Sequence, residues 1–303
     1  MNKIKPWVLA ARPKTLFASL APIIVGLSFT FFIYQSIDWM IAILTILSAT
    51  LIQIGSNYAN DAYDYLKGSD DSRIGPQRMA QMGILSPHAI LNMMYFIFII
   101  SVLIGFYLAL VGGWIIVVIG LTSILFAIIY TGGPFPLAYN GLGDIAVFIF
   151  FGLIATTGTF YLQSQAIDSS TNIFEHILPM ILISVSIGCL NTAILVVNNI
   201  RDYKSDKDSQ KRTIIVLLGQ KFGCFEYLFL LVISVFCFIV YGIIIQKYLI
   251  SYLMLFNVFI IYSLIRKVFN YKNSNLNKVL EKTSQFVFLN ALLFLFYTLV
   301  VSL

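Results

Sequence analysis

Long apolar stretches alternate with polar links along almost the whole chain. Nine of these stretches have roughly the 20 residues that an α-helix needs to cross the hydrocarbon core of a bilayer. They cover residues 16–35, 39–60, 89–110, 114–131, 144–163, 176–199, 224–245, 248–265 and 284–302. The pattern predicts an all-α fold, a polytopic transmembrane helical bundle of about nine spans.

The composition supports a membrane protein over a soluble one. Of the 303 residues, 59% are hydrophobic and only 11% are charged, whereas a soluble domain has about 25% charged residues. The three cysteines form no C-x-x-C pair and the two histidines are far apart in sequence, so a Cys/His metal site is not expected. The sequence also lacks the G-x-x-x-x-G-K, G-x-S-x-G and H-E-x-x-H motifs of soluble nucleotide-binding proteins and hydrolases.

The basic residues indicate the orientation of the spans. Nine crossings place the N-terminus and the links 61–88, 132–143, 200–223 and 266–283 on one side, with all 19 Lys and Arg except Lys247. The positive-inside rule assigns such a side to the cytoplasm. We therefore expect a multi-pass protein of the cell (inner or plasma) membrane, in contact with membrane lipid, whose N-terminus and polar links are cytoplasmic. The net charge of +6 then reflects topology, and no nucleic-acid partner is expected.

One motif occurs twice. Asn57-x-x-x-Asp61 closes the second span, and Asn198-x-x-x-Asp202 closes the sixth. The two copies are four spans apart, so an even number of crossings returns them to the same face. The repeat predicts a single domain, residues 1–303, built from two similar four-helix halves (about 1–140 and 141–270) and a ninth helix.

The acidic residues gather on this same face. Eight aspartates lie there: Asp61, Asp64, Asp70, Asp71, Asp144, Asp202, Asp206 and Asp208. If the second and sixth spans continue as helices, two rows form, each on one helix face: Asn57, Asp61 and Asp64, and Asn198, Asp202 and Asp206. Converging carboxylates repel one another, and a hard divalent cation relieves that repulsion. Mg²⁺ is typically held by a few carboxylates together with substrate phosphates.

Basic residues accompany both acidic rows. Arg73 and Arg78 follow the first row, and Arg201, Lys204, Lys207, Lys211 and Arg212 surround the second. Arg binds phosphate oxygens in a bidentate fork and Lys acts as a point charge. The mixture favours a metal–diphosphate site, with a solvated loop as the plainer alternative for each link. Asp144 has its own alternative, because an Asp at a helix start also caps the helix.

Other polar residues lie in or beside the spans. Asn191 lies inside the sixth span, where it either contacts a ligand or bonds a neighbouring helix. Tyr130 and Tyr139 lie near span ends, on either side of the start of the medium-length link 132–143, and we expect both to anchor the chain at the membrane interface.

Several strings resemble the UbiA-type intramembrane prenyltransferases, and the resemblance covers nearly the whole chain. The strings that carry it are Asn57-Tyr-Ala-Asn-Asp-Ala-Tyr-Asp64, Lys67-Gly-Ser-Asp70, Arg73-Ile-Gly-Pro-Gln-Arg78, Arg12-Pro-Lys-Thr15, Gly133-Pro-Phe-Pro-Leu-Ala-Tyr139, Gly141-Leu-Gly-Asp144, Asn198-Asn-Ile-Arg-Asp202 and Lys211-Arg-Thr213. Within that family they are most similar to the 1,4-dihydroxy-2-naphthoate polyprenyltransferases of menaquinone synthesis.

The resemblance implies a set of site residues. It assigns catalysis to Asp61, Asp64, Asp202 and Asp206, and Mg²⁺ binding to these four with Asn57, Asn60 and Asn198. It assigns the diphosphate to Arg73, Arg78, Lys211 and Arg212, and the aromatic acceptor to Arg12, Lys14 and Asp144. The chain departs from the family pattern at Gly68 and Gln210, where an Asp is usual. Asp70, Asp71 or Asp208 could take over those places.

The implied reaction is Mg²⁺-dependent transfer of a polyprenyl group from polyprenyl diphosphate to an aromatic acid. With 1,4-dihydroxy-2-naphthoate as acceptor, CO₂ and diphosphate are lost and demethylmenaquinone is formed. Another acceptor, such as 4-hydroxybenzoate, is the nearest alternative. A cation-coupled transporter is an alternative of a different class, although transporters usually hold ionisable groups near the membrane midplane and these acids lie at span ends.

Overall fold

The computed structural model describes residues 3–69, 75, 78–168, 170, 173–272 and 275–302. In this part of the chain the ordered segments are helical, apart from one isolated bridge between Asn140 and Arg212. In chain order they are α1 (Lys5–Ala11), α2 (Pro13–Tyr34), α3 (Trp39–Leu66), α4 (Pro87–Ile129), η1 (Leu137–Tyr139), α5 (Gly143–Phe148), η2 (Ile149–Ile154), α6 (Ala155–Ile167), η3 (Ile173–His176), α7 (Ile177–Asp208), α8 (Ile214–Leu218), α9 (Gln220–Ile244), α10 (Leu249–Phe269) and α11 (Leu276–Val301).

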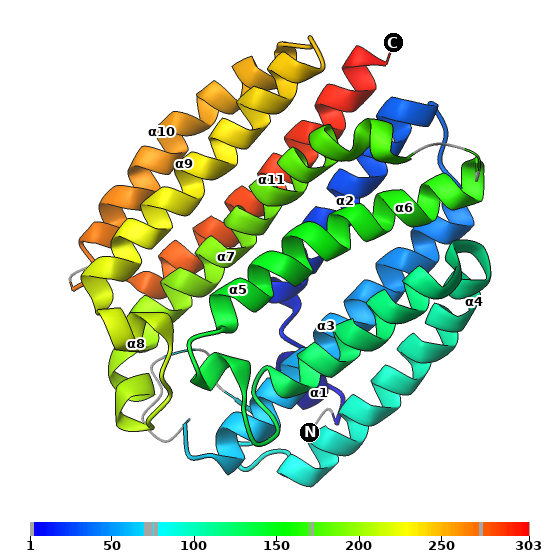
Figure 1. The fold of residues 1–303 in the computed structure, drawn as a ribbon. Coiled ribbons are helices and arrows are strands. Elements are labelled where there is room, and N and C mark those ends of the chain that lie inside the picture. Colours follow the sequence, from blue (N-terminus) through cyan, green and yellow to red (C-terminus); the bar gives the residue numbers. More distant parts are fainter. Residues whose placement is uncertain are drawn as a thin grey trace.

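The membrane-spanning bundle predicted from the sequence is confirmed. Within the described residues, 8 helical segments are long and apolar enough to cross a bilayer. The longest, α4, has 43 residues and contains two spans, because its backbone is broken at Gly113 (φ 67°, ψ −161°). Glycine tolerates this left-handed conformation, and α4 doubles back there in Figure 1. The two arms of α4 correspond to the predicted spans 89–110 and 114–131.

Two helices extend beyond the predicted spans. The second and sixth spans were expected to end near residues 60 and 199, but α3 continues to Leu66 and α7 to Asp208. Both extensions end at the lower end of the bundle in Figure 1, and that of α7 lies beside α8. The two acidic rows therefore lie on regular helix, as the spacing required.

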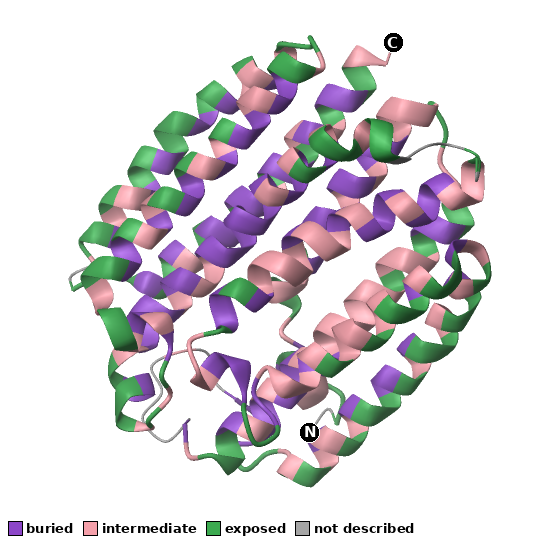
Figure 2. Cartoon of the chain, in the orientation of Figure 1, coloured by how far each residue is buried: buried purple, intermediate pink, exposed green. Residues whose placement is uncertain are grey.

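The core of the bundle surrounds α7. This helix is the most deeply buried of the spans, and Figure 2 shows buried residues along most of its length. Gly152 in η2 and Gly188 in α7 let two helices cross closely, since a Cβ built on Gly152 would lie 2.5 Å from the Gly188 Cα. This crossing holds the α5–α6 segment against α7.

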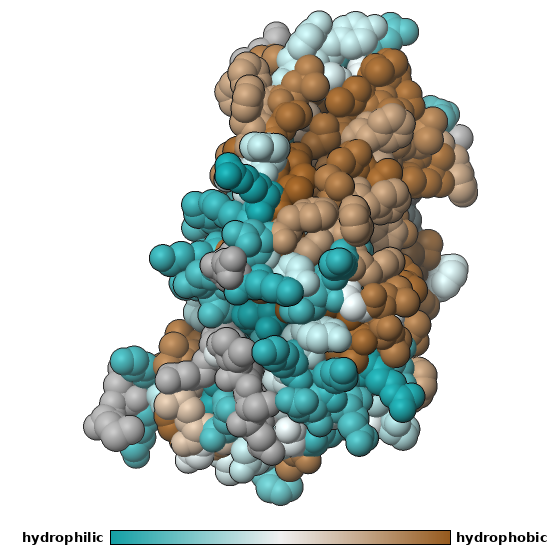
Figure 3. All heavy atoms as spheres, turned by 90° about the vertical axis from the view of Figure 1, so that its left-hand side faces the viewer, coloured by the Kyte–Doolittle hydropathy of each residue, from teal (hydrophilic) through white to brown (hydrophobic). Residues whose placement is uncertain are grey.

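The outer surface divides into an apolar part and a polar end. Large apolar side chains such as Trp114 and Phe259 are 74% and 79% exposed, which suits contact with lipid chains. Figure 3 shows hydrophobic residues over the upper part of one face and hydrophilic residues over the lower part, at the end where α3 and α7 terminate. The polar end holds the candidate chemistry.

Candidate active site

A cavity of about 400 Å³ opens between the helices. Its walls come from α2, α3, both arms of α4, α5, η2, α6 and α7, together with Lys211 and Thr213 beyond α7. Along α3 the lining runs from Asp64 to Thr45, a separation of about 28 Å in a helix. The cavity therefore joins a charged end to a far end lined by apolar side chains, among them Leu108, Ile116 and Leu162.

Asp64 is the centre of the charged end. Its carboxylate is 1% exposed and lies 2.7 Å from Arg78 Nη1 and 3.8 Å from Lys211 Nζ. The Tyr139 hydroxyl donates a hydrogen bond to Asp64 Oδ1 at 2.8 Å. A carboxylate this deeply buried needs such compensation, because the uncompensated charge would cost several kcal/mol.

Lys211 joins the two acidic rows. Its ammonium lies 3.8 Å from Asp64 Oδ2 on α3 and 4.0 Å from Asp206 Oδ1 on α7. The backbone also fixes Lys211, since its N–H donates to the Asp206 carbonyl at 2.8 Å. Asp64 and Asp206 therefore converge on one positive charge at the mouth of the cavity.

Asp61 holds the segment that carries Arg78. Its two carboxylate oxygens accept hydrogen bonds from the backbone N–H groups of Met79 and Ala80, both at 3.1 Å. Arg78 also donates to the Asn60 carbonyl, and Asn60 Oδ1 accepts from the Thr131 hydroxyl at 2.9 Å. This network fixes the position of the Arg78 guanidinium beside Asp64.

Asp202 forms a bidentate pair with its neighbour. Arg201 Nε and Nη2 lie 2.7 and 2.6 Å from the two Asp202 oxygens. The same guanidinium donates to Asn198 Oδ1 at 2.7 Å and to Asn277 Oδ1 on α11 at 3.0 Å. Arg201 thus ties the second acidic row to α11.

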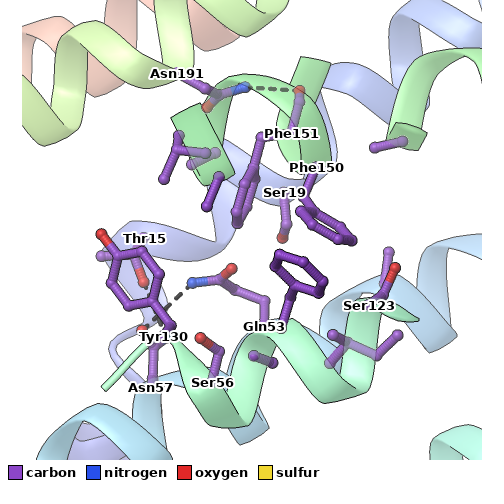
Figure 4. Close-up of a pocket in the computed structure, with 18 of the residues that line it drawn as sticks. Thr15, Ser19, Gln53, Ser56, Asn57, Ser123, Tyr130, Phe150, Phe151 and Asn191 are labelled. Carbon is purple, nitrogen blue, oxygen red and sulfur yellow. Dashed lines mark hydrogen bonds between the residues drawn. The ribbon is translucent and has the colours of Figure 1, made fainter. Parts of the chain in front are cut away.

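Asn57 places the N-terminal segment against the cavity. Its amide donates to the Ala11 carbonyl at 2.9 Å and to the Thr15 hydroxyl at 3.0 Å. Between these two residues the chain turns at Arg12, whose φ is 52°, and Arg12 itself lines the cavity. Figure 4 shows Asn57 and Thr15 on the same wall as Gln53 and Ser56.

The remaining predicted site residues divide into three groups. Asp144 is 5% exposed and lines the cavity. Lys14 and Arg212 are exposed and do not line it; Lys14 pairs with Glu281 at 3.2 Å. Asp208 is exposed at the end of α7. Arg73, Asp70 and Asp71 lie outside the described residues.

Tyr139 corrects one expectation. It was expected to be an interfacial anchor, but its ring lies beneath two ammonium groups, 4.7 Å from Lys67 Nζ and 5.2 Å from Lys211 Nζ. Burial and the nearby Asp64 raise the pKa of the Tyr139 phenol, so its proton stays in place as a donor to Asp64. Tyr130 also lines the cavity. The sequence signal was the medium link itself, which has no Lys or Arg although it lies on the basic face.

Asn191 combines both roles that the sequence left open. Its amide donates to the Phe151 carbonyl at 3.3 Å, a bond between α7 and η2. It also lines the cavity, and Figure 4 shows this contact on the wall that carries Phe150 and Phe151.

The oxygen ligands of this site suit a divalent cation only with help from a substrate. Among the described residues, three or more Asp, Glu, His or Cys side chains nowhere converge as a metal cage. Asp61 and Asp202 are engaged by N–H donors. Asp64 and Asp206 share the Lys211 charge, and Asp64 also pairs with Arg78 and accepts from Tyr139. Two carboxylates beside cationic side chains fit Mg²⁺ that takes its other ligands from phosphate and water.

Comparison with known proteins gives a consistent result. The pattern that defines the UbiA prenyltransferase family matches residues 19–299. A Haemophilus influenzae protein named 1,4-dihydroxy-2-naphthoate octaprenyltransferase is 38% identical over 80% of this chain and 78% of its own length. A Mycobacterium leprae protein of the same name is 35% identical over 72% of this chain and 71% of its own.

The fold is also found among solved structures. A UbiA homologue from Archaeoglobus fulgidus, solved with GPP and Mg²⁺, superposes with a TM-score of 0.71 and covers 98% of this chain and 99% of its own. At a sequence identity of 16%, this superposition shows a shared fold alone.

Proposed function

The chain belongs to the UbiA prenyltransferase family, and on that premise we propose that it transfers a polyprenyl group from polyprenyl diphosphate to 1,4-dihydroxy-2-naphthoate. CO₂ and diphosphate leave, and the product is demethylmenaquinol, the hydroquinone form of demethylmenaquinone, an intermediate of menaquinone synthesis. The observation that carries the proposal is the cavity, which joins a charged end at Asp64 and Asp206 to a long apolar end. The names of the relatives support the choice of acceptor.

The diphosphate of the donor binds at the charged end. Arg78 and Lys211 line the cavity there, and both already neutralise carboxylates, so they can accept a phosphate ligand without moving far. Arg73 and Arg212, from the same two links, complete the proposed set. Arginine forks and lysine point charges stabilise the negative charge that develops as the C–O bond breaks.

Mg²⁺ is the proposed cofactor. Asp64 and Asp206 would hold it, with Asp61, Asp202, Asn57, Asn60 and Asn198 forming the surrounding network described above. When bound, the metal supplies Lewis-acid stabilisation of the leaving diphosphate. The protein's own part is to bring two carboxylates together on one face and to exclude water with the buried contacts of Tyr139 and Arg78.

The polyprenyl tail lies in the apolar part of the cavity. The lining reaches from Asp64 to Thr45 on α3 and to both arms of α4 near their turn, most of the thickness of a hydrocarbon core. Gly105 and Gly120 line this part, and a Cβ on either would meet no atom within 4 Å. An apolar chain fits this space and keeps the reactive allylic carbon at the charged end.

The acceptor enters from the same face. Arg12 and Asp144 both line the cavity, and a guanidinium is suited to the acceptor's carboxylate. Lys14, exposed and paired with Glu281, would act only in attracting the acid to the entrance. The distribution of basic residues supports a cytoplasmic site in the cell membrane, with the outer apolar residues in contact with lipid.

A direct assay tests the proposed function. Purified protein in detergent receives Mg²⁺, a polyprenyl diphosphate and either 1,4-dihydroxy-2-naphthoate or 4-hydroxybenzoate. We expect prenylated product and CO₂ with the naphthoate only, and none when EDTA removes the metal. Product from 4-hydroxybenzoate alone would show that this acid, and not the naphthoate, is the acceptor. Substrate flux across proteoliposomes without prenyl transfer would show that the protein is a transporter and not an enzyme.

A further inference from the structure

Asp144 presents a buried oxygen that no group in the described part of the chain satisfies. The residue lies in the first turn of α5, is 5% exposed and lines the cavity. Its Oδ1 atom accepts no hydrogen bond from a described residue. Leaving a buried acceptor unsatisfied costs about 1–3 kcal/mol, and more when it is charged. Such an atom on a cavity wall is suited to a ligand that donates a hydrogen bond.

A second unsatisfied acceptor lies on the neighbouring helix. Asn191 on α7 is 3% exposed and lines the same cavity. Its amide nitrogen bonds Phe151, but its Oδ1 has no partner among the described residues. The two helices pack together at this level, since a Cβ on Gly143, next to Asp144, would lie 3.7 Å from Leu195 on α7. The α5–α7 wall therefore offers two unsatisfied acceptors.

The Tyr130 hydroxyl lies close to this wall. It would be 3.1 Å from a Cβ built on Gly143. A neutral phenol beside Asp144 closes one side of the space without adding a positive charge. Two cations that line the cavity, Arg78 and Lys211, pair with Asp64 instead.

We propose that the α5–α7 wall binds the hydroxyl groups of a dihydroxylated aromatic acceptor, with Asp144 accepting a hydrogen bond and then the proton from one of them. Asn191 Oδ1 accepts from the other hydroxyl. This inference rests on the proposed function and names the residue that activates the ring. Different residues then bind the two kinds of group on the acceptor. The carboxylate of Asp144 binds a hydroxyl, whereas the guanidinium of Arg12 suits the acceptor's own carboxylate.

Transfer of a hydroxyl proton to Asp144 starts the proposed step. The O–H bond breaks, and its proton passes to Asp144 while the oxygen becomes a ring carbonyl. The adjacent ring carbon, which bears the carboxylate, forms a C–C bond to the allylic carbon of the donor. The allylic C–O bond breaks, and its electron pair leaves with diphosphate. The carboxylate then departs as CO₂, its bonding pair restores the aromatic ring, and Asp144 returns the proton to the oxygen.

The experiment compares variants with acceptors that differ only in hydroxyl groups. Asp144→Asn keeps the size of the side chain but cannot take the proton. Glu226→Gln is the matched control, because Glu226 is also an acid in a span with an unsatisfied oxygen, yet it does not line the cavity. The ligands are 1,4-dihydroxy-2-naphthoate and its dimethyl ether, with binding measured by microscale thermophoresis and turnover by product formation.

We expect wild-type protein and Glu226→Gln to bind the dihydroxy acid about 10- to 100-fold more tightly than the dimethyl ether, as hydrogen bonds to a charged group imply. Asp144→Asn should lose most of that preference and about 100-fold in turnover, with unchanged binding of a polyprenyl thiolodiphosphate. If Asp144→Asn does not fold, the affinities of wild-type protein for the dihydroxy acid and for its dimethyl ether test the inference by themselves. Equal affinities for the two ligands would overturn it.

Two failures remain distinguishable. Wild-type protein that forms no prenylated naphthoate contradicts the proposed function. Wild-type protein that forms it while Asp144→Asn retains normal turnover and ligand preference contradicts only the role of Asp144.

Discussion

Replacing Lys211 by Met tests the convergence of the two acidic rows. Lys211→Met keeps a side chain of similar length but removes the charge that Asp64 and Asp206 share at 3.8 and 4.0 Å. At such distances each pair is worth about 4 kcal/mol with an effective dielectric constant of about 20, before desolvation is subtracted. The three side chains are only 13%, 2% and 8% exposed, so solvent screens these pairs weakly.

The net effect is smaller because Arg78 still contacts Asp64. Removing one partner of a buried pair costs about 3–5 kcal/mol, and we expect the lower end of that range for Lys211→Met. A divalent cation should recover much of the loss, since two carboxylates without their shared lysine attract Mg²⁺ more strongly. The substitution should therefore lower thermal stability without Mg²⁺ and increase the stabilisation that Mg²⁺ provides.

The assay is thermal unfolding in detergent with EDTA or with Mg²⁺. Lys207→Met is the control, because Lys207 is an exposed lysine on the same helix extension and its loss changes the net charge equally. If Lys211→Met and Lys207→Met unfold at the same temperatures under both conditions, the shared-charge description of the site is wrong.

Three further substitutions probe other parts of the site. Asp61→Asn should raise the KM for the donor about 10-fold, because the carboxylate anchors Met79 and Ala80 next to Arg78; steady-state kinetics unchanged from wild type would contradict this. Tyr139→Phe removes the donor to Asp64 and should cost about 1 kcal/mol, measured as a lower unfolding temperature. Gly120→Phe should fill the apolar end of the cavity and reduce kcat/KM for long donors but not short ones, and equal losses for both would refute that placement of the tail.

The spans were predictable because they depend on composition alone. Apolar stretches of membrane length identify helices without any tertiary information, and Gly113 in the Gly-Gly pair marked the break that divides α4. The helix ends were less predictable. The extensions of α3 to Leu66 and α7 to Asp208 are polar, and hydropathy treats polar helix and polar loop alike. The division into two similar halves stays a prediction.

The site was predictable as a set of residue types but not as a network. Helical spacing placed Asp64 and Asp206 at the ends of two spans, yet only tertiary packing brings Lys211 between them. Tyr139 was missed for the same reason, since its hydroxyl meets Asp64 across 75 positions of sequence. The pairing of Arg201 with Asp202 was equally hidden, because adjacent residues usually point to different sides of a helix.

Binding of a non-reactive donor tests the central claim most directly. Isothermal titration of a polyprenyl thiolodiphosphate into wild-type protein, Asp64→Asn and Asp206→Asn, each with and without Mg²⁺, asks whether both helices contribute to one site. We predict Mg²⁺-dependent binding by the wild type and a loss of at least about 100-fold in both variants, as expected when a buried charged partner is removed. Wild-type affinity in either variant would show that α3 and α7 do not hold the metal and diphosphate together.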